Sequence, residues 1–225
     1  MIIAIDGPSG AGKSSLARQI AKALNIIYVD TGALYRTVGL FIRQNNVDPK
    51  NAEAVAAQLP RLSLDMTFVD GEQHILLCGV DVGDSIRTPE MSMYASAVSA
   101  IPAVRAFLLD TQRDMAKKHS IVMDGRDIGT VIFPDATVKI FLSATPEARA
   151  RRRALELTAK GIVTTEEEVL ADMKVRDEQD RNRAVAPAVP AEDAILLDNS
   201  DLSFEGTVDA ALEIIRRVAA SKGAM

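Results

Sequence analysis

The chain has 225 residues, enough for one α/β domain with an insertion. Of these residues 48% are hydrophobic and 25% charged, which is ordinary for a soluble globular protein. A net charge of −5, with three tyrosines, six phenylalanines and no tryptophan, argues against binding to nucleic acid. Because no apolar run is long enough to cross a bilayer and no signal core precedes the first apolar run, we expect a cytoplasmic protein without a membrane partner. The single cysteine, Cys78, excludes an internal disulfide, and we expect it to fill a strand position.

Five short, β-branched apolar runs are separated by helix-like stretches, as βαβ units require, and they predict a parallel sheet. These strand candidates are Ile2–Ile5, Ile26–Val29, Ile121–Met123, Val138–Leu142 and Ala194–Leu197. Helices are expected at Lys13–Leu24, Leu34–Gln44, Ala103–Lys118, Glu147–Ala159, Thr165–Arg181 and Phe204–Ala220. Thr145-Pro146 fits a helix N-cap followed by proline at the first helical position.

Residues from about 60 to 100 follow a different pattern. Apolar and polar residues alternate over Leu62–Phe68, Asp70-Gly71 is a hairpin-turn signal, and His74–Cys78 and Val80–Val82 are further strand candidates. Alternation indicates an antiparallel sheet with one face in water, unlike the parallel core. We therefore expect a small β insertion between the second and third core strands. We interpret it as a second-substrate module, the alternative being an excursion without a function.

The motif G-x-x-x-x-G-K-[ST] follows the first apolar run and precedes the first helix, which is the context of a P-loop. Its glycines let backbone N–H groups surround a phosphate, and the helix N-terminus adds a partial positive charge. We expect Lys13 to reach the β- and γ-phosphates of a nucleotide and the Ser14 hydroxyl to hold Mg²⁺. The predicted ATP-binding loop comprises Gly7, Pro8, Ser9, Gly10, Ala11, Gly12, Lys13, Ser14 and Ser15.

Two charged motifs follow core strands, so they lie at the carboxyl edge of the sheet, where α/β proteins bind ligands. Asp30 ends the second strand, and Arg36 on the next helix can pair with a phosphate; a capped helix start also explains this motif. Asp124-Gly125-Arg126-Asp127 places three charges after a buried strand, which is costly unless they bind something. We expect Asp124 near Mg²⁺ through water and Arg126 on phosphate, the alternative being a structural ion pair.

Arginines are concentrated between Arg149 and Arg183, where acidic residues are also frequent. Arg149 and Arg153 share one helix face at i,i+4, so an anion between them is a natural partner, whereas Arg152 is spaced to pair with Glu156.

Later in this region, Asp180 can accept sugar hydroxyls while Arg176 and Arg183 contact phosphate; a solvated charged helix is the alternative. The stretch between Leu157 and Glu167 is a candidate lid, because phosphoryl transfer needs water to be excluded. No general base is evident, which favours an acceptor that is already an anionic phosphate monoester. The histidines, His74 and His119, have no second ligand type at metal spacing, and we interpret both as structural or solvated.

From Ile3 to about Ile214 the chain resembles the cytidylate kinases of the nucleoside monophosphate kinase family. The resemblance rests on the motifs Asp6–Lys13, Asp30–Arg36, Asp124–Thr130 and Asp180–Arg183. It implies an α/β P-loop kinase with a five-stranded parallel sheet in the order 2-3-1-4-5 and helices on both faces. The implied organisation is one domain over 1–225, with an inserted NMP-binding subdomain at 60–100 and a LID segment at 154–168. The implied reaction is transfer of the γ-phosphate of ATP, with Mg²⁺, to CMP or dCMP, in pyrimidine nucleotide metabolism and by a monomer.

The resemblance also implies roles for individual residues. Catalysis falls to Lys13, Arg126 and Arg183, and the donor nucleotide is contacted by Arg149 and Arg153 as well as by the P-loop. Within the acceptor site, the phosphate is held by arginines matching Arg36, Arg126 and Arg183. The cytosine is read by residues matching Ser96, Arg105 and Asp127. The sugar is held by Arg176 and Asp180. The whole implied CMP-binding set is Asp30, Thr31, Tyr35, Arg36, Ser96, Arg105, Arg126, Asp127, Arg176, Asp180 and Arg183. Thr31 replaces the family's usual serine and retains the hydroxyl.

Other functions remain open at this point. UMP is the nearest competing acceptor, but it lacks the amine that Asp127 would recognise. A kinase acting on a hydroxyl, such as a shikimate-type kinase, shares the P-loop. A nucleotide-dependent switch is less favoured because no Asn-Lys-x-Asp guanine signature occurs, and we interpret Asp198-Asn199-Ser200 only as a strand-end turn.

Overall fold

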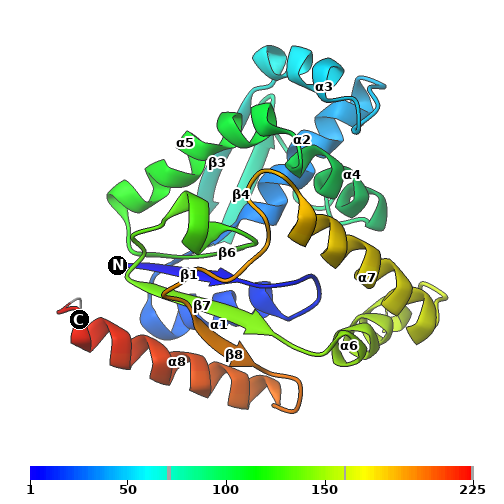
Figure 1. Cartoon of the computed structure of the whole chain (residues 1–225). Coiled ribbons are helices and arrows are strands. Elements are labelled where there is room, and N and C mark those ends of the chain that lie inside the picture. The colour runs from blue at the N-terminus through cyan, green and yellow to red at the C-terminus, as the bar shows by residue number, and fades with distance from the viewer. Residues whose placement is uncertain (70–71, 160, 224–225) are drawn as a thin grey trace. The chain divides into compact units, whose positions relative to one another are not determined.

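The computed structural model describes residues 1–69, 72–159 and 161–223, so the predicted Asp70-Gly71 turn lies outside the described residues. The larger sheet has five strands in the order β2-β6-β1-β7-β8, which is 2-3-1-4-5 when only its own strands are numbered. Figure 1 labels β6, β1, β7 and β8 of this sheet. Its pairings β1–β6, β1–β7 and β7–β8 are parallel, which confirms the predicted fold class. The bounds of these strands are Ile2–Asp6 for β1, Ile27–Asp30 for β2, Ile121–Gly125 for β6, Val138–Ser143 for β7 and Ile195–Asp198 for β8.

The chain divides into two compact units, the first formed by Met1–Ile26 with Ser120–Met225 and the second by Ile27–His119. The first unit contains β1, β6, β7 and β8 with the helices α1 (Lys13–Leu24), α6 (Pro146–Ala159), α7 (Glu166–Asn182) and α8 (Phe204–Ser221). A short π-helix, η2 (Ile128–Ile132), follows β6. The strand residues Ile3, Ile5 and Ile140 are almost fully buried, and they form the centre of this unit.

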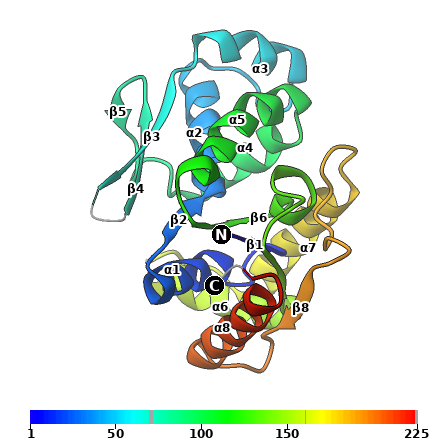
Figure 2. The same cartoon turned by 90° about the vertical axis from the view of Figure 1, so that its left-hand side faces the viewer.

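The second unit is built on α2 (Thr31–Gln44), α4 (Pro89–Ser99) and α5 (Pro102–Lys118), beside the antiparallel sheet β3-β4-β5 (Figure 2). These strands span Leu64–Val69, Glu72–Leu77 and Val80–Asp81, and the short helices α3 (Ala52–Gln58) and η1 (Leu59–Arg61) precede them. Intermediate and exposed residues alternate along β3, as expected for a sheet with one face in water. The core of this unit joins α2, α4 and α5 to β4 through Leu34, Val98, Leu108 and Ile75.

The six predicted helices are present, and side chains cap the first turns of α2, α6, α7 and α8. α1 has the predicted bounds, Lys13–Leu24. α2 begins at Thr31, before the predicted start, because Asp30 Oδ1 accepts the Ala33 N–H at 2.9 Å and caps the helix. Thr145 Oγ1 accepts the Ala148 N–H at 3.2 Å with Pro146 at the first helical position, which confirms the predicted cap of α6.

Two predictions within residues 60–100 are wrong. We did not predict α4, although Thr88-Pro89 begins it as Thr145-Pro146 begins α6, with Thr88 Oγ1 accepting the Met91 N–H at 3.1 Å. Cys78 does not fill a strand position. It has φ 50° and is followed by Gly79 with φ 81°, while Leu77 and Val80 are paired across the turn. Two consecutive positive φ angles are typical of a type I′ hairpin turn, so Cys78 is an exposed turn residue between β4 and β5.

Among the described residues, no single helix has the length and apolar composition needed to span a membrane. The consecutive helices α4 and α5 meet these criteria only as a pair bent by 101°.

Candidate functional site

The P-loop connects β1 to α1 and has the backbone expected of an anion-binding loop. Gly10 and Gly12 have φ angles of 73° and 91°, a region that favours glycine. A Cβ atom on Gly7 would lie 2.0 Å from the carbonyl oxygen of Leu142 on β7, so no larger residue fits there. The Lys13 ammonium donates to the Pro8 carbonyl oxygen at 2.7 Å, within the loop itself. Burial lowers the pKa of Lys13, as does Arg126, against the opposing effect of Asp124 and Asp6.

The predicted Mg²⁺ residues are in contact. Ser14, at the start of α1, donates its hydroxyl hydrogen to Asp124 Oδ2 at 2.8 Å, and Asp124 is buried at the end of β6. No cluster of three or more His, Cys, Asp or Glu side chains with metal-binding geometry occurs among residues 1–69, 72–159 and 161–223. Mg²⁺ commonly uses one or two protein oxygens together with substrate phosphates, so this pair fits such an ion without a full protein cage.

A cluster of carboxylates and guanidinium groups forms in the first unit. Arg126 Nε donates to Asp180 Oδ2 at 2.9 Å, while Arg183 contacts Asp127 Oδ1 at 3.4 Å and Asp180 Oδ1 at 3.8 Å. Arg183 Nε also donates to the Ala186 carbonyl oxygen. Burial raises the pKa of Asp180, but Arg126, Arg176 and Arg183 outweigh burial and hold that pKa below its usual range. The charged residues predicted after β6 and in α7 therefore do lie together.

This cluster is next to the P-loop. The charges of Arg126 and Arg176 both act on Lys13, and a pocket is lined by Pro8 of the P-loop and by Asp180 of the cluster. The other residues lining the pocket are Phe141, Asp177, Arg181 and Ala188. The lining of this pocket therefore contains two carboxylates and one guanidinium group, while Arg126 and Arg176 place positive charge near Lys13 of the P-loop.

The arginines of α6 are arranged differently from our prediction. Arg149 is buried and donates to Ala144 O at 3.1 Å and to Ser9 O of the P-loop at 2.8 Å. It also pairs at 2.6 Å with Asp177 Oδ2 on α7, whose other oxygen accepts the Ser9 N–H at 3.3 Å. Arg153 instead pairs at 2.7 Å with Glu156, so the two arginines have different carboxylate partners.

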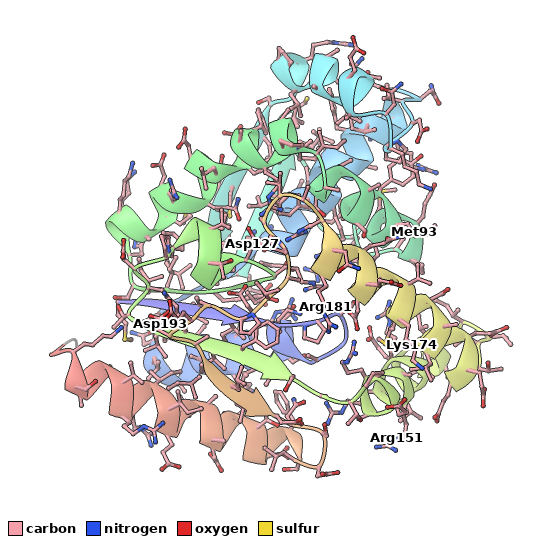
Figure 3. All side chains as sticks on the ribbon, in the orientation of Figure 1. Met93, Asp127, Arg151, Lys174, Arg181 and Asp193 are labelled. Atoms are coloured by element: carbon pink, nitrogen blue, oxygen red, sulfur yellow. The ribbon has the colours of Figure 1, made fainter. Side chains whose placement is uncertain are left out.

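Arg152 was predicted to pair with Glu156 but instead donates to Asn199, at 3.1 Å to Oδ1 and 2.6 Å to the carbonyl oxygen. Asn199 is buried and donates through Nδ2 to Ala11 O of the P-loop at 3.1 Å. The turn after β8, which we interpreted as a simple strand end, therefore supports the nucleotide loop. By contrast, Arg151 is exposed and points away from the sheet (Figure 3).

The second unit holds the remaining predicted residues. Asp30 is the N-cap of α2 and also accepts from Arg36 Nη2 at 3.1 Å, which confirms the capped helix start, while binding of a phosphate by Arg36 stays a prediction. Gln73 of β4 accepts the Asp30 N–H at 2.7 Å and donates to its carbonyl oxygen at 3.3 Å. Arg36 Nε is buried, with no hydrogen-bond partner in the part of the chain that the structure describes. A buried, unsatisfied guanidinium N–H beside a helix N-terminus fits an anionic ligand.

The predicted base-reading residues of the second unit, Ser96 and Arg105, come from α4 and α5. The Arg105 guanidinium lies 5.6 Å from the centre of the Tyr35 ring, and Arg105 Nη1 donates to Ser99 O at 3.2 Å. Ser96 is half-buried on α4, the helix that we did not predict, and Thr31 is buried at the first position of α2. The histidine interpretation also fits, since His74 is exposed and contacts Asp81 at 2.6 Å.

Comparison with known proteins gives the family. The sequence profile of the cytidylate kinase family matches residues 3–217. A cytidylate kinase of Thermosipho melanesiensis is 48% identical over 214 residues, covering 95% of this chain and 96% of that protein. A cytidylate kinase of Salmonella choleraesuis is 45% identical over 216 residues, covering 96% of this chain and 95% of that protein. The chain belongs to the cytidylate kinase family.

A solved structure adds support for the fold alone. A gluconokinase from Sinorhizobium meliloti has a TM-score of 0.50 and 15% identity, covering 97% of this chain and 93% of that chain. As in other P-loop kinases, a parallel sheet presents the nucleotide loop at its carboxyl edge.

Several residues at the site were missed by sequence reasoning. Arg152, Asn199, Asp177 and Gln73 all contact a predicted motif, but each is separated from it by many residues in the chain. Only Asp6 carried a local signal, because it is an acidic residue at the end of a buried strand, directly before the first glycine of the P-loop.

Proposed function

We propose that this protein transfers the γ-phosphoryl group of ATP to CMP or dCMP, giving ADP and CDP or dCDP. An oxygen of the CMP phosphate forms the new bond to the γ-phosphorus, and the bond from that phosphorus to the β–γ bridging oxygen breaks. The electron pair of the broken bond remains on ADP. Because the attacking oxygen is already anionic, no protein base needs to remove a proton. The observation that carries the proposal is the family match over residues 3–217, together with a guanidinium cluster beside the P-loop.

The residue roles follow from charge and position. We assign Lys13, Arg126 and Arg183 to charge neutralisation around the transferred group, which is the main requirement of phosphoryl transfer. Arg149 supports the P-loop, since it binds the Ser9 carbonyl oxygen. We also assign the CMP phosphate to Arg36, Arg126 and Arg183, and the sugar to Arg176 and Asp180.

Base recognition is assigned to Asp127 with Ser96 and Arg105. A carboxylate accepts from the exocyclic amine of cytosine, and a guanidinium donates to the ring acceptors. UMP presents a carbonyl oxygen in place of the amine, and this oxygen would face the Asp127 carboxylate without a hydrogen between them. The proposal therefore includes a preference for CMP over UMP.

Ser14 and Asp124 would hold Mg²⁺, because both offer oxygen ligands and their side chains meet at 2.8 Å. When bound, the ion supplies positive charge to the β- and γ-phosphates. We further propose an NMP-binding subdomain at 60–100, a LID segment at 154–168, and a cytoplasmic monomer that serves pyrimidine nucleotide metabolism.

An acceptor screen tests this function. ADP formation from MgATP is measured by a coupled assay with CMP, dCMP, UMP, shikimate or no acceptor. We expect ADP only with nucleoside monophosphates, and most rapidly with CMP or dCMP. Rapid turnover with a hydroxyl acceptor, or slow turnover independent of any acceptor, would contradict the proposal.

The Asp127→Ala variant tests base recognition within the same screen. We expect the ratio of kcat/KM for CMP to that for UMP to fall about tenfold or more, since one charge-assisted hydrogen bond is worth about 1.5–3 kcal/mol. Equal losses toward both acceptors would show that Asp127 does not read the base.

A further inference from the structure

The last residue of β1, Asp6, makes two hydrogen bonds to the start of η2. Its Oδ1 accepts the Ile128 N–H at 2.8 Å and its Oδ2 accepts the Gly129 N–H at 2.7 Å. Asp6 is 4% exposed, and it directly precedes Gly7, the first glycine of the P-loop. One carboxylate therefore connects the segment after β6 to the beginning of the nucleotide loop.

These bonds satisfy donors that have no partner within the helix. The first N–H groups of any helix lack an intrahelical acceptor, and leaving such groups buried and unpaired is costly. A carboxylate at a helix N-terminus also interacts favourably with the helix dipole. Asp6 thus does for η2 what a capping side chain does for an ordinary helix.

As a result, Asp127 has no capping role. It occupies the N-cap position of η2, where an aspartate side chain usually accepts a backbone N–H, but its side chain makes no such bond. Its carboxylate instead contacts Arg183 at 3.4 Å, in the guanidinium cluster (Asp127 is labelled in Figure 3). Because Asp6 caps the helix from the neighbouring strand, Asp127 can face the proposed acceptor site.

The junction between Asp6 and η2 is closely packed. A Cβ atom on Gly129 would lie 3.3 Å from Asp6 Oδ2 and 3.1 Å from the Lys139 Cδ atom on β7. Glycine therefore lets the η2 backbone come within hydrogen-bonding distance of the carboxylate. The Lys139 ammonium group forms an ion pair with Asp193 Oδ1 at 2.6 Å, and this ion pair limits how far the Lys139 side chain can move away from Gly129.

We propose that Asp6 is a positioning residue for the acceptor site, and that its two bonds to η2 fix the direction in which Asp127 presents its carboxylate. Asp6 acts through backbone amides and touches no substrate. This inference rests on the proposed function, because it takes Asp127 to read the base of the acceptor.

The Asp6→Asn variant provides the first test. An amide keeps one acceptor oxygen but places an NH₂ group against the second backbone N–H, so one of the two bonds must break. We expect the KM for CMP to rise about tenfold and the CMP-to-UMP ratio of kcat/KM to fall. The Kd of MgATP measured without acceptor should stay within twofold, because both hydrogen bonds of Asp6 go to η2 and neither goes to the phosphate-binding loop.

Asp48→Asn is the matched control. Asp48 also accepts a backbone N–H, that of Lys50 at 3.0 Å, but it is exposed and lies outside both the proposed site and the 60–100 subdomain. Its kinetic constants should equal those of the wild type.

Gly129→Ala approaches the same junction from the other side and leaves the carboxylate in place. Gly129 does not have a positive φ angle, so alanine suits its backbone, and this variant should fold even if Asp6→Asn does not. We expect the same rise in KM and the same loss of discrimination.

Three results would overturn the proposal. Unchanged KM and discrimination in a folded variant, with a lower Tm alone, would leave Asp6 a merely structural role. An equal loss of MgATP affinity would show that Asp6 serves the P-loop instead. A normal Gly129→Ala enzyme would show that the packing of this junction does not control acceptor binding. Failure of Asp127→Ala to alter discrimination would separately refute base reading by Asp127, the premise of the inference.

Discussion

Gly39, in the middle of α2, offers a quantitative test of how the second unit is built. A Cβ atom on Gly39 would lie 2.8 Å from the Tyr94 Cβ atom and 3.4 Å from the Ala95 nitrogen, both on α4. The Tyr94 Cβ atom is attached directly to the backbone, so Gly39→Ala requires α4 itself to move. Since α2 carries Thr31 and Arg36 while α4 carries Ser96, this movement would disturb the proposed acceptor residues.

The expected magnitude follows from two opposing effects. Overpacking of this kind costs about 1–3 kcal/mol, whereas replacing glycine by alanine inside a helix gains up to about 1 kcal/mol. Gly206→Ala in α8 isolates the second effect, because a Cβ atom there meets only Ser203 Oγ at 3.4 Å, an ordinary contact. The two variants should differ in unfolding free energy by about 1–3 kcal/mol, with Gly39→Ala the less stable.

Thermal unfolding of both variants and the wild type measures this difference, since 1 kcal/mol corresponds to about 2–4 °C in Tm for a chain of this size. Gly39→Ala should also raise the KM for CMP several-fold, with the Kd of MgATP unchanged. If Gly39→Ala proved as stable as Gly206→Ala, the close approach of α2 and α4 would be wrong.

Two further substitutions test the first unit. Arg183→Ala should lower kcat about 10²- to 10³-fold, the usual effect of losing one charge-stabilising group, while circular dichroism still shows a folded protein; a normal kcat would remove Arg183 from the site. Arg149→Lys should raise the Kd of MgATP about tenfold, because an ammonium cannot reach Ala144 O, Ser9 O and Asp177 together as the guanidinium does. Unchanged nucleotide affinity, measured by titration calorimetry, would show that the P-loop does not depend on this support.

Much of the fold could be predicted because its signals are local. The bounds of α1 follow from an apolar face beginning directly after the P-loop, and the cap of α6 follows from Thr145-Pro146. The same signature at Thr88-Pro89 was overlooked because the preceding alternation indicated strands. Cys78 was wrongly predicted to lie in a strand for a similar reason. The apolar run before it indicated a strand, whereas Cys78 and Gly79 form a turn that glycine makes possible.

The site could be predicted only where its motifs are contiguous. Residues that follow strands, such as Asp30 and Asp124, can be placed at the sheet edge from sequence alone. The partner of Arg152 could not be predicted. Helical spacing indicated Glu156, but the partner in the structure is Asn199, which is far away in sequence and therefore leaves no local signal. For the same reason nothing in the sequence linked Asp6 to the amides of Ile128 and Gly129, more than a hundred residues away.

Asp6 and Asp180 are both buried carboxylates of the first unit, yet their pKa values move in opposite directions. Burial raises the pKa of Asp6 to about 6, although hydrogen bonds from the Gly129 and Ile128 amides offset part of this rise. Of the nearby charges, Asp127 raises the pKa of Asp6 and Lys13 lowers it. At Asp180, burial also raises the pKa, but the guanidinium groups of the cluster outweigh it and hold the pKa below its usual range. Amide donors compensate for burial less completely than a set of full positive charges does.

The two carboxylates should therefore affect the pH dependence of stability with opposite signs. Ionised Asp180 stabilises the fold above its unfolded pKa of 3.8, and this stabilisation is lost as the pH falls through its lower folded pKa. For Asp6 the folded state prefers the protonated form, so stability falls by about 3 kcal/mol as the pH rises from 3.8 to beyond about 6.

At pH 7, Asp6→Asn removes the destabilisation of about 3 kcal/mol that the ionised carboxylate causes, but it loses one hydrogen bond worth about 1 kcal/mol. The variant should therefore have a free energy of unfolding about 2 kcal/mol higher than the wild type. Asp180→Asn should instead lower the free energy of unfolding. Urea unfolding between pH 4 and 7 measures both. If Asp6→Asn proved less stable at pH 7 than the wild type, the carboxylate would be a stabilising cap. If it proved more stable but bound CMP poorly, Asp6 would be kept in place at the expense of stability, as expected of a residue that serves the reaction.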